Sequence, residues 1–356
     1  MSRKADHTAP IYKTIYDELV QKIKKDSLPR LSAVLLAKEY KINRNTADKI
    51  ISLLETNNWV RRIPRKGTFP VKQSAQGINS INIIYDFNSF NQEFLNSYPY
   101  ANAKLIESIY KSELANQCNI NILLIDPAGT DSQILEKLSA SGPRAGFIVL
   151  NPQPFPLLIS LLRREKMPYI TFGPEADMNQ VTHDSYHSAC RAVEHLIKVA
   201  HRKRIAFMNS GGLLTNPWTA PRFNAYSDTL RKNGIPFKEQ YIFSAQITDE
   251  NIVEFINSNV HGKGIDAIFA SSFEVGRRTV NILKLKGIKI PEEVAVIVFY
   301  DLPEFSLSTP TITAIRVPLE KMGHAILEKL IDMINFGFRD DIRITFSNEL
   351  VLRESC

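Results

Sequence analysis

The chain has 356 residues, of which 44% are hydrophobic and 23% charged, the composition of a folded protein large enough for two or three domains. No apolar run is as long as a membrane span, and the first residues lack the apolar core of a secretory signal, so we expect a cytoplasmic protein. The three cysteines are too few and too far apart for a disulfide framework or a cysteine metal cluster.

The net charge of +7 is concentrated at the N-terminal end. Residues 1–72 hold 16 Lys/Arg against 7 Asp/Glu, which leaves 28 basic and 30 acidic residues for the rest of the chain. A basic surface of this kind favours a polyanion as partner. We therefore expect residues 1–72 to bind nucleic acid, and we expect the nearly neutral remainder of the chain to have a different partner.

The N-terminal segment has the pattern of three helices and a hairpin. Residues 11–25 place apolar side chains on one helical face, and Ser32 and Asn43 are candidate N-caps of two further helices. Residues 59–71 then alternate apolar and basic residues around Gly67, as a two-stranded ribbon does. This order predicts a winged helix-turn-helix whose third helix enters the major groove of operator double-stranded DNA.

The same segment resembles the GntR family of winged-helix regulators. The matching pieces keep the family's spacing over about 60 residues: Leu28-Pro29, Ser32, Leu36-Ala37, Asn43 to Thr46, Leu53 to Glu55 and Arg65 to Phe69. The resemblance implies DNA contacts by Arg44 and Thr46 and places Gly67 at the wing tip. Val34 and Asp48 stand where the family often has arginine, so the operator sequence does not carry over.

The predicted DNA-binding residues are Ser32, Asn43, Arg44, Asn45, Thr46, Lys49, Arg62, Arg65, Lys66 and Gly67. Taken alone, Arg61, Arg62, Arg65 and Lys66 are more typical of a solvated basic hairpin. The preceding helix-turn-helix pattern favours the DNA-binding interpretation.

Residues 72–80 are polar and read as a linker, after which apolar strands alternate with helices. The strand-like runs lie at 81–85, 120–125, 145–150, 169–172, 204–208, 266–270 and 294–299, and the helical patterns at 101–116, 132–139, 157–164, 185–200, 222–233, 250–257 and 275–285. This alternation predicts an α/β fold with doubly wound parallel sheets in two lobes, with a ligand crevice between them.

Residues 80–352 resemble the sensor domain of the LacI/GalR family, which is related to periplasmic binding proteins. The matching pieces include Val181, Asp184, residues 192–207, Arg222, Asn233-Gly234-Ile235, residues 290–294, Thr309-Pro310 and Val317-Pro318. We expect a winged-helix domain at 1–71, a linker at 72–80 and a two-lobed effector-binding and dimerisation domain at 81–356.

The resemblance implies that Arg222, which opens a helix of the second lobe, grips the effector. A guanidinium offers several donors in a fixed fork, suited to sugar hydroxyls or a carboxylate. An exposed arginine at a helix start is the alternative. The predicted effector-binding residues are Phe87, Asn88, Phe90, Trp218, Arg222, Ser272, Phe273, Tyr300 and Asp301. Ser272-Phe273 and Tyr300 depart from the family's sugar-contacting Asn, Asp and Asp, and each aromatic could instead fill the core.

The sequence carries no motif for catalysis, and its histidines do not have metal-ligand spacing, so we expect no metal and no cofactor. Residues 319–334 form a wide apolar helix that either fills the core of one lobe or also makes a two-fold dimer contact. The predicted function is that of a homodimeric transcription regulator, a repressor, whose effector is a sugar or sugar derivative. A cleft enzyme carrying a DNA-binding head is the alternative, and a solute-binding protein is disfavoured by the basic head.

Overall fold

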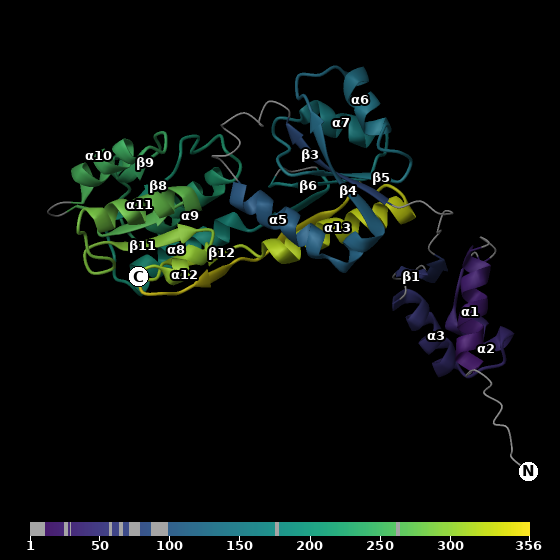
Figure 1. The fold of residues 1–356 in the computed structure, drawn as a ribbon. Helices are drawn as coiled ribbons and strands as arrows, with labels where there is room; N and C mark the ends of the chain where they lie inside the picture. Colours follow the sequence, from purple (N-terminus) through teal and green to yellow (C-terminus); the bar gives the residue numbers. More distant parts are fainter. Residues whose placement is uncertain are drawn as a thin grey trace, which may run out of the picture.

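The computed structural model describes residues 11–24, 28, 30–56, 59–63, 67–70, 79–86, 99–174, 178–260 and 264–356. Within them the chain forms an N-terminal head (11–70) and two α/β lobes, which Figure 1 shows joined to one another with the head beside the first lobe. The predicted linker falls largely on residues 71–78, outside the described part.

The head contains three helices and a hairpin in the predicted order: α1 (Ile11–Lys24), α2 (Ala33–Glu39), α3 (Arg44–Thr56), β1 (Val60–Ile63) and β2 (Gly67–Pro70). The predicted caps are present, since Ser32 Oγ accepts from the amide of Leu35 at 3.4 Å and Asn43 Oδ1 accepts from that of Thr46 at 2.7 Å. The strands β1 and β2 pair antiparallel. A compact core of the head's own apolar residues holds these elements together.

The first lobe is a six-stranded parallel sheet in the order β13-β7-β6-β5-β3-β4. Its strands are β3 (Asn79–Asp86), β4 (Cys118–Ile125), β5 (Ala145–Val149), β6 (Tyr169–Phe172), β7 (Gln180–His183) and β13 (Arg343–Phe346). Its helices are α5 (Pro99–Lys111), the 3-10 turn η2 (Glu113–Gln117), α6 (Asp131–Ser139), α7 (Pro156–Arg164) and α13 (Leu319–Phe336). The fully buried strand β5 marks the centre of this lobe.

The second lobe repeats the plan with the sheet order β14-β12-β11-β10-β8-β9. Its strands are β8 (Ile205–Met208), β9 (Ile242–Phe243), β10 (Ala267–Ala270), β11 (Ala295–Phe299), β12 (Thr313–Arg316) and β14 (Glu349–Val351). Its helices are α8 (Ser185–Lys198), α9 (Thr219–Lys232), η3 (Glu239–Tyr241), α10 (Asp249–Asn259), α11 (Phe273–Leu285) and α12 (Pro303–Leu307). The sheet departs from the predicted parallel arrangement only at β14, which pairs antiparallel with β12.

The chain passes between the lobes three times, after β7, after β12 and after β13. Asn348 on the third passage donates from Nδ2 to the carbonyl oxygen of Asp184 on the first, at 3.1 Å. One continuous apolar core contains residues of both lobes. The predicted two-lobed α/β architecture is therefore confirmed, and the three passages form its hinge.

The apolar stripe of α13 packs inside the chain. Met322, Ile326, Leu327, Leu330 and Met333 are all buried among residues of the lobes, so core packing accounts for the width of the stripe. These side chains are not available for the dimer contact that the sequence left open. No described helix is both long and apolar enough to cross a membrane.

Candidate functional site

Arg222 lies in the first turn of α9 and is 1% exposed, so the alternative of a merely exposed arginine is wrong. Its Nη1 donates to the carbonyl oxygen of Ser271 at 2.6 Å. The guanidinium carbon lies 3.7 Å from the ring centroid of Phe299 and 5.3 Å from that of Tyr300. Contacts with aromatic faces and a carbonyl stabilise a cation away from water. The arginine is thus held rigidly at the carboxyl ends of β10 and β11.

Trp218 and Tyr300 approach the same place from the second lobe, and His183 meets them from the end of β7. The His183 ring stacks on Trp218 with centroids 5.1 Å apart, and Trp218 also contacts Phe172 at 5.1 Å. These side chains come from both lobes and, with Arg222 and Phe299, are all buried. We call Phe172, His183, Trp218, Arg222, Phe299 and Tyr300 the interlobe cluster.

His183 has a polar neighbour at each ring nitrogen. Asn348 Nδ2 donates to the carbonyl oxygen of Asp184 and lies 3.1 Å from His183 Nδ1. On the other side of the ring, His183 Nε2 lies 3.3 Å from Tyr300 Oη. Burial, together with the charge of Arg222, holds the pKa of His183 well below its usual value. The ring is neutral and ties the hinge to the interlobe cluster.

Sequence reasoning missed His183, because the histidines were weighed only as metal ligands. Its position directly before the helix cap Asp184, at the end of a strand, was the available signal. Among the described residues, no three His, Cys, Asp or Glu side chains are grouped as a metal site would require.

Tyr300 has a backbone φ of 74°, a left-handed conformation that bulky residues seldom adopt. Such strain often accompanies functional sites. Phe273 lies at the margin of the interlobe cluster, with its ring 6.4 Å from Tyr300 and 5.8 Å from Tyr100 of α5. Ser272 is the half-buried cap residue of α11 and makes no side-chain cap bond. The predicted aromatic replacements thus occur together at the lobe boundary.

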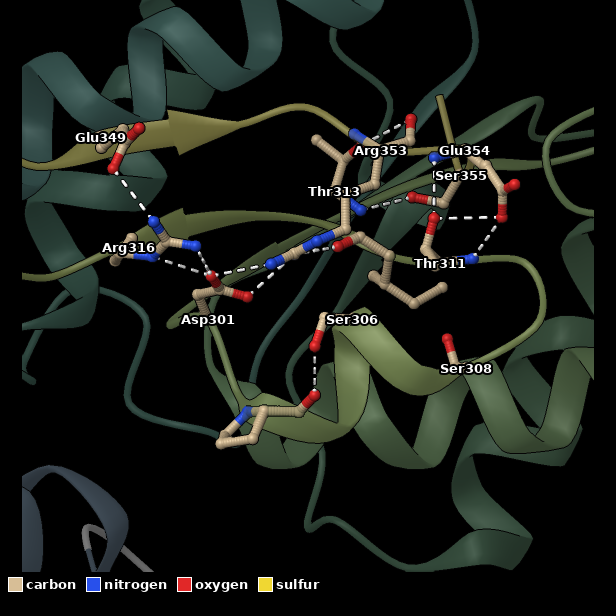
Figure 2. A network of polar contacts seen from close by, with 12 residues as sticks. Asp301, Ser306, Ser308, Thr311, Thr313, Arg316, Glu349, Arg353, Glu354 and Ser355 are labelled. Atoms are coloured by element: carbon tan, nitrogen blue, oxygen red, sulfur yellow. Dashed lines mark hydrogen bonds and ion pairs between the residues drawn. The ribbon is translucent and has the colours of Figure 1, made fainter.

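Asp301, one of the predicted effector-binding residues, is held by two arginines. Its oxygens accept from Arg353 Nη1 and Nη2 at 2.8 and 2.9 Å and from Arg316 Nη2 at 2.7 Å, as Figure 2 shows. The Asp301 side chain is 6% exposed. Arg316 is the last residue of β12, and Arg353 follows the end of β14. Both arginines therefore lie beside Asp301 and pair with its carboxylate. Asp301 therefore forms ion pairs with both arginines, and its role as a ligand acceptor stays a prediction.

A cavity of about 530 Å³ lies at the lobe boundary. It is bordered by Tyr300 and Asp301 after β11, by Tyr100 and Lys104 of α5, and by the second and third hinge passages. It falls within the size range of small-ligand sites. Phe87, Asn88 and Phe90, predicted to follow the first strand into the crevice, lie outside the described residues.

On the head, the residues at the start of α3 are open to solvent. The Arg44 side chain is 75% exposed and lies 4.0 Å from Asp48, and Asn43, Asn45 and Lys49 are exposed as well. Lys49 Nζ also lies 4.9 Å from the Tyr12 ring. Thr46 is half-buried, and Ser32 caps α2.

Of the hairpin residues predicted to bind DNA, the structure describes Arg62 and Gly67. Arg62 pairs with Glu55 of α3 at 3.2 Å and donates to Ser52 Oγ at 3.1 Å. Gly67 has a φ of 112°, and a side chain there would meet the Arg30 guanidinium. Arg65 and Lys66 lie outside the described residues.

Residues 193–356 match the family model described as a periplasmic binding protein-like domain. The chain is 24% identical over 204 residues to the HTH-type transcriptional regulator CelR of Thermobifida fusca, covering 56% of this chain and 59% of that protein. It is 28% identical over 173 residues to AscG of Escherichia coli (strain K12), covering 48% and 50%. The chain thus spans about half to three fifths of these two relatives, both of which are named as regulators and not as enzymes.

Solved structures show the same fold. A LacI-family regulatory protein from Chloroflexus aggregans superposes with a TM-score of 0.66 at 19% identity, covering 78% of this chain and 98% of that one. A CelR–cellobiose complex gives 0.61 at 18% identity, covering 92% and 100%. The periplasmic-binding-protein-like lobes are thereby confirmed. The GntR resemblance of the head gains no support from these relatives, which imply a helix-turn-helix of the LacI type.

Proposed function

We propose that the chain is a DNA-binding transcription regulator, a repressor, whose operator affinity is controlled by a small molecule bound between the lobes. The observation that carries the proposal is the joining of a basic head, with polar side chains exposed at the start of α3, to two lobes hinged around the interlobe cluster. Both named relatives are HTH-type transcriptional regulators, which supports the proposal.

The head reads DNA through α3, with Arg44, Asn45, Thr46 and Lys49 nearest the bases and the hairpin on the backbone. The antiparallel β1–β2 pair directly after α3 favours a winged head of GntR type, since a wing needs such a hairpin. Ser32 and Asn43 cap their helices, so their side-chain oxygens are already used and their role in DNA binding would be through backbone amides.

The effector is a sugar or sugar derivative. One structural relative is a regulator in complex with cellobiose, which supports a carbohydrate here. The rings of Tyr300, Phe273 and Tyr100 lie beside one another and would offer stacking faces, with aromatic residues at positions 273 and 300 where the resembled family has carboxylates. Arg222 packs against the rings of Phe299 and Tyr300 at the same lobe boundary, so it would hold Tyr300 in place beside the effector.

The protein is a cytoplasmic homodimer with the domain division expected from the sequence, 1–71, 72–80 and 81–356. The separate core of the head supports the first boundary. Two heads in a dimer would present two α3 helices to a pseudo-palindromic operator.

Fluorescence anisotropy with the DNA upstream of the protein's own gene tests the proposal. We expect sequence-selective binding that weakens steeply with salt. Replacing Arg44 by Ala should weaken specific binding by about 1–3 kcal/mol without lowering the melting temperature. The matched control Lys13→Ala removes an exposed cation from α1 and should bind as the unchanged protein does. Equal binding by the Arg44→Ala variant would place the DNA contact elsewhere.

The effector site is tested by thermal shift against monosaccharides, disaccharides, sugar acids and sugar phosphates, because a ligand of the native state raises the melting temperature. Because Arg222 is buried, Arg222→Lys is a better test than Arg222→Ala. Lysine keeps the positive charge but lacks the planar guanidinium with its fixed set of N–H donors. A hit whose affinity is unchanged in Arg222→Lys and in Phe273→Ala would bind outside the proposed site.

A further inference from the structure

Arg61 and Arg62 are neighbours on β1, and their side chains lie on opposite faces of the hairpin, as successive residues of a strand do. Arg62 stays within the head, where Glu55 and Ser52 of α3 hold it. Arg61 leaves the head and reaches the first lobe. Its Nη2 lies 3.5 Å from Asp332 Oδ2, and its guanidinium carbon lies 5.1 Å from the Phe336 ring centroid.

The receiving surface is the last part of α13. Asp332 and Phe336 are four residues apart, so they share one face of the helix. The Asp332 side chain is 24% exposed and also contacts Lys329 Nζ at 3.7 Å. Burial raises the pKa of Asp332, and Arg61 and Lys329 oppose that rise. Phe336 is 39% exposed, so it offers its ring to a cation from outside the lobe.

A cavity of about 490 Å³ lies between the two bodies at this contact. Glu55 and Val60 border it from the head, and Leu114 of η2 with His324 and Ile331 of α13 border it from the lobe. The contact is therefore a partly filled interface, and among the described residues Arg61 makes a direct polar link across it.

We propose that Arg61 is a docking residue that holds the head against α13, and that its charge serves the sensor and not the DNA backbone. The helix α13 has 18 residues and begins directly after the second hinge passage, so it extends about 27 Å from the hinge to the head. Its buried face is part of the core shared by both lobes. A change in lobe closure at the hinge would thus move the surface on which Arg61 is seated. This consequence for DNA binding rests on the proposed function, whereas the docking itself does not.

A weak contact is sufficient for this role. An exposed ion pair by itself contributes little to stability. The head is tethered to the lobe by the same chain, which raises the effective concentration of the two surfaces into the millimolar range for a short connection. A contact of this strength is populated when nothing competes and is released when another partner binds the head, which is what a switch requires.

Docking is tested on the full chain without DNA or effector. Arg61→Gln and its matched control Arg62→Gln each remove one charge from β1. We expect Arg61→Gln to increase the maximum dimension in small-angle X-ray scattering and to speed amide hydrogen exchange at 329–336, and Arg62→Gln to change neither. Thermal melts identify any variant whose head has simply unfolded. Indistinguishable behaviour of the two variants would overturn the proposal.

The charge swap sharpens the test. Arg61→Asp should release the head because it places two carboxylates together, and adding Asp332→Arg should restore the compact form. A double variant as extended as Arg61→Asp alone would show that Asp332 is not the partner.

DNA binding separates docking from a phosphate contact. If Arg61 touched a phosphate, Arg61→Gln would reduce the salt dependence of operator binding by about one charge. Under the proposal that slope stays unchanged, and the effector alters the operator affinity of Arg61→Gln by a smaller factor than in the unchanged protein. A chain that binds no DNA would refute the proposed function and still show the scattering difference.

Discussion

At the residue scale, the hinge depends on a histidine that must remain neutral. His183 is buried with Asn348 and Tyr300 beside its ring nitrogens, and burial disfavours its protonated form in the folded chain. Its folded pKa is depressed, and that of the half-buried His195 is lowered as well by burial. In the unfolded chain both titrate near 6.5.

We therefore predict that stability falls as the pH decreases below about 6.5. The unfolded state binds more protons than the folded state in that range, so unfolding becomes easier by up to about 1.4 kcal/mol per pH unit for each histidine. The carboxyl groups with lowered pKa begin to contribute only below their unfolded pKa of about 4.5. Urea unfolding at pH 7.5 and 5.5 measures the effect, and His183→Gln should reduce the pH slope even if it lowers stability at both values. An unchanged slope would contradict the assignment.

Asp301 carries the second prediction at this scale. Its removal leaves Arg353, whose side chain is 13% exposed, without the carboxylate that neutralises it. We expect Asp301→Ala to lower the free energy of unfolding by about 2–4 kcal/mol, because breaking a buried pair strands one charge. The control is Glu349→Ala, which removes the 66% exposed carboxylate on the other side of Arg316 and should cost less than about 1 kcal/mol. Chemical denaturation compares the two, and equal costs would mean that burial does not matter here.

The sequence predicted individual side-chain contacts less well than it predicted helices, strands or domains. The positions Trp218, Arg222, Phe273 and Tyr300 meet as predicted at the lobe boundary, because parallel strands bring their carboxyl ends to one edge. What each side chain contacts was not predictable. The pairing of Asp301 with Arg353 joins residues 52 apart, and the bond from Asn348 to His183 joins residues 165 apart. No local pattern encodes such pairs.

At the element scale, the periodic patterns predicted the central strands and the longer helices well. Fully buried runs such as β5 and β11 show up as continuous apolar sequence. The missed strands are β7, β9, β12, β13 and β14, which are two to four residues long. β13 is exposed at every second residue and begins with Arg343, so its sequence resembles a loop. Its assignment depends on the partner strand β7.

A close approach between the helices α13 and α5 gives a third prediction. Gly323 of α13 lies against α5, where an added Cβ would meet Ser108 Oγ and come within 2.8 Å of the carbonyl oxygen of Leu105. The backbone oxygen cannot rotate away, so the helices must separate. We expect Gly323→Ala to destabilise the chain by about 1–3 kcal/mol, as overpacking does. The exposed neighbour Lys321→Ala should leave the melting temperature nearly unchanged, and a stable Gly323→Ala would show that α13 can shift on α5.

At the scale of the whole molecule, the lobes and the head must communicate in both directions if the proposed function holds. Thermodynamic linkage requires that an effector which weakens operator binding tenfold is itself bound tenfold more weakly by the DNA complex. Isothermal titration of the effector into free protein and into the protein–operator complex measures this ratio, and anisotropy measures its counterpart. Unequal factors would mean that a third state, such as a change in oligomerisation, takes part.

Both sheets are completed by strands from the C-terminal part of the chain, which affects folding during synthesis. Residues 343–351 supply β13 to the first lobe and β14 to the second, so each sheet receives its last strand from the same short stretch. Ser355 then donates to the Val296 carbonyl at 2.6 Å, with its own oxygen accepting from the Thr313 amide at 2.8 Å. During synthesis, neither lobe can complete its sheet before these residues leave the ribosome. The head precedes the lobes in the chain and has a core of its own, so a chain that ends before residue 343 would carry a finished head on two unfinished lobes.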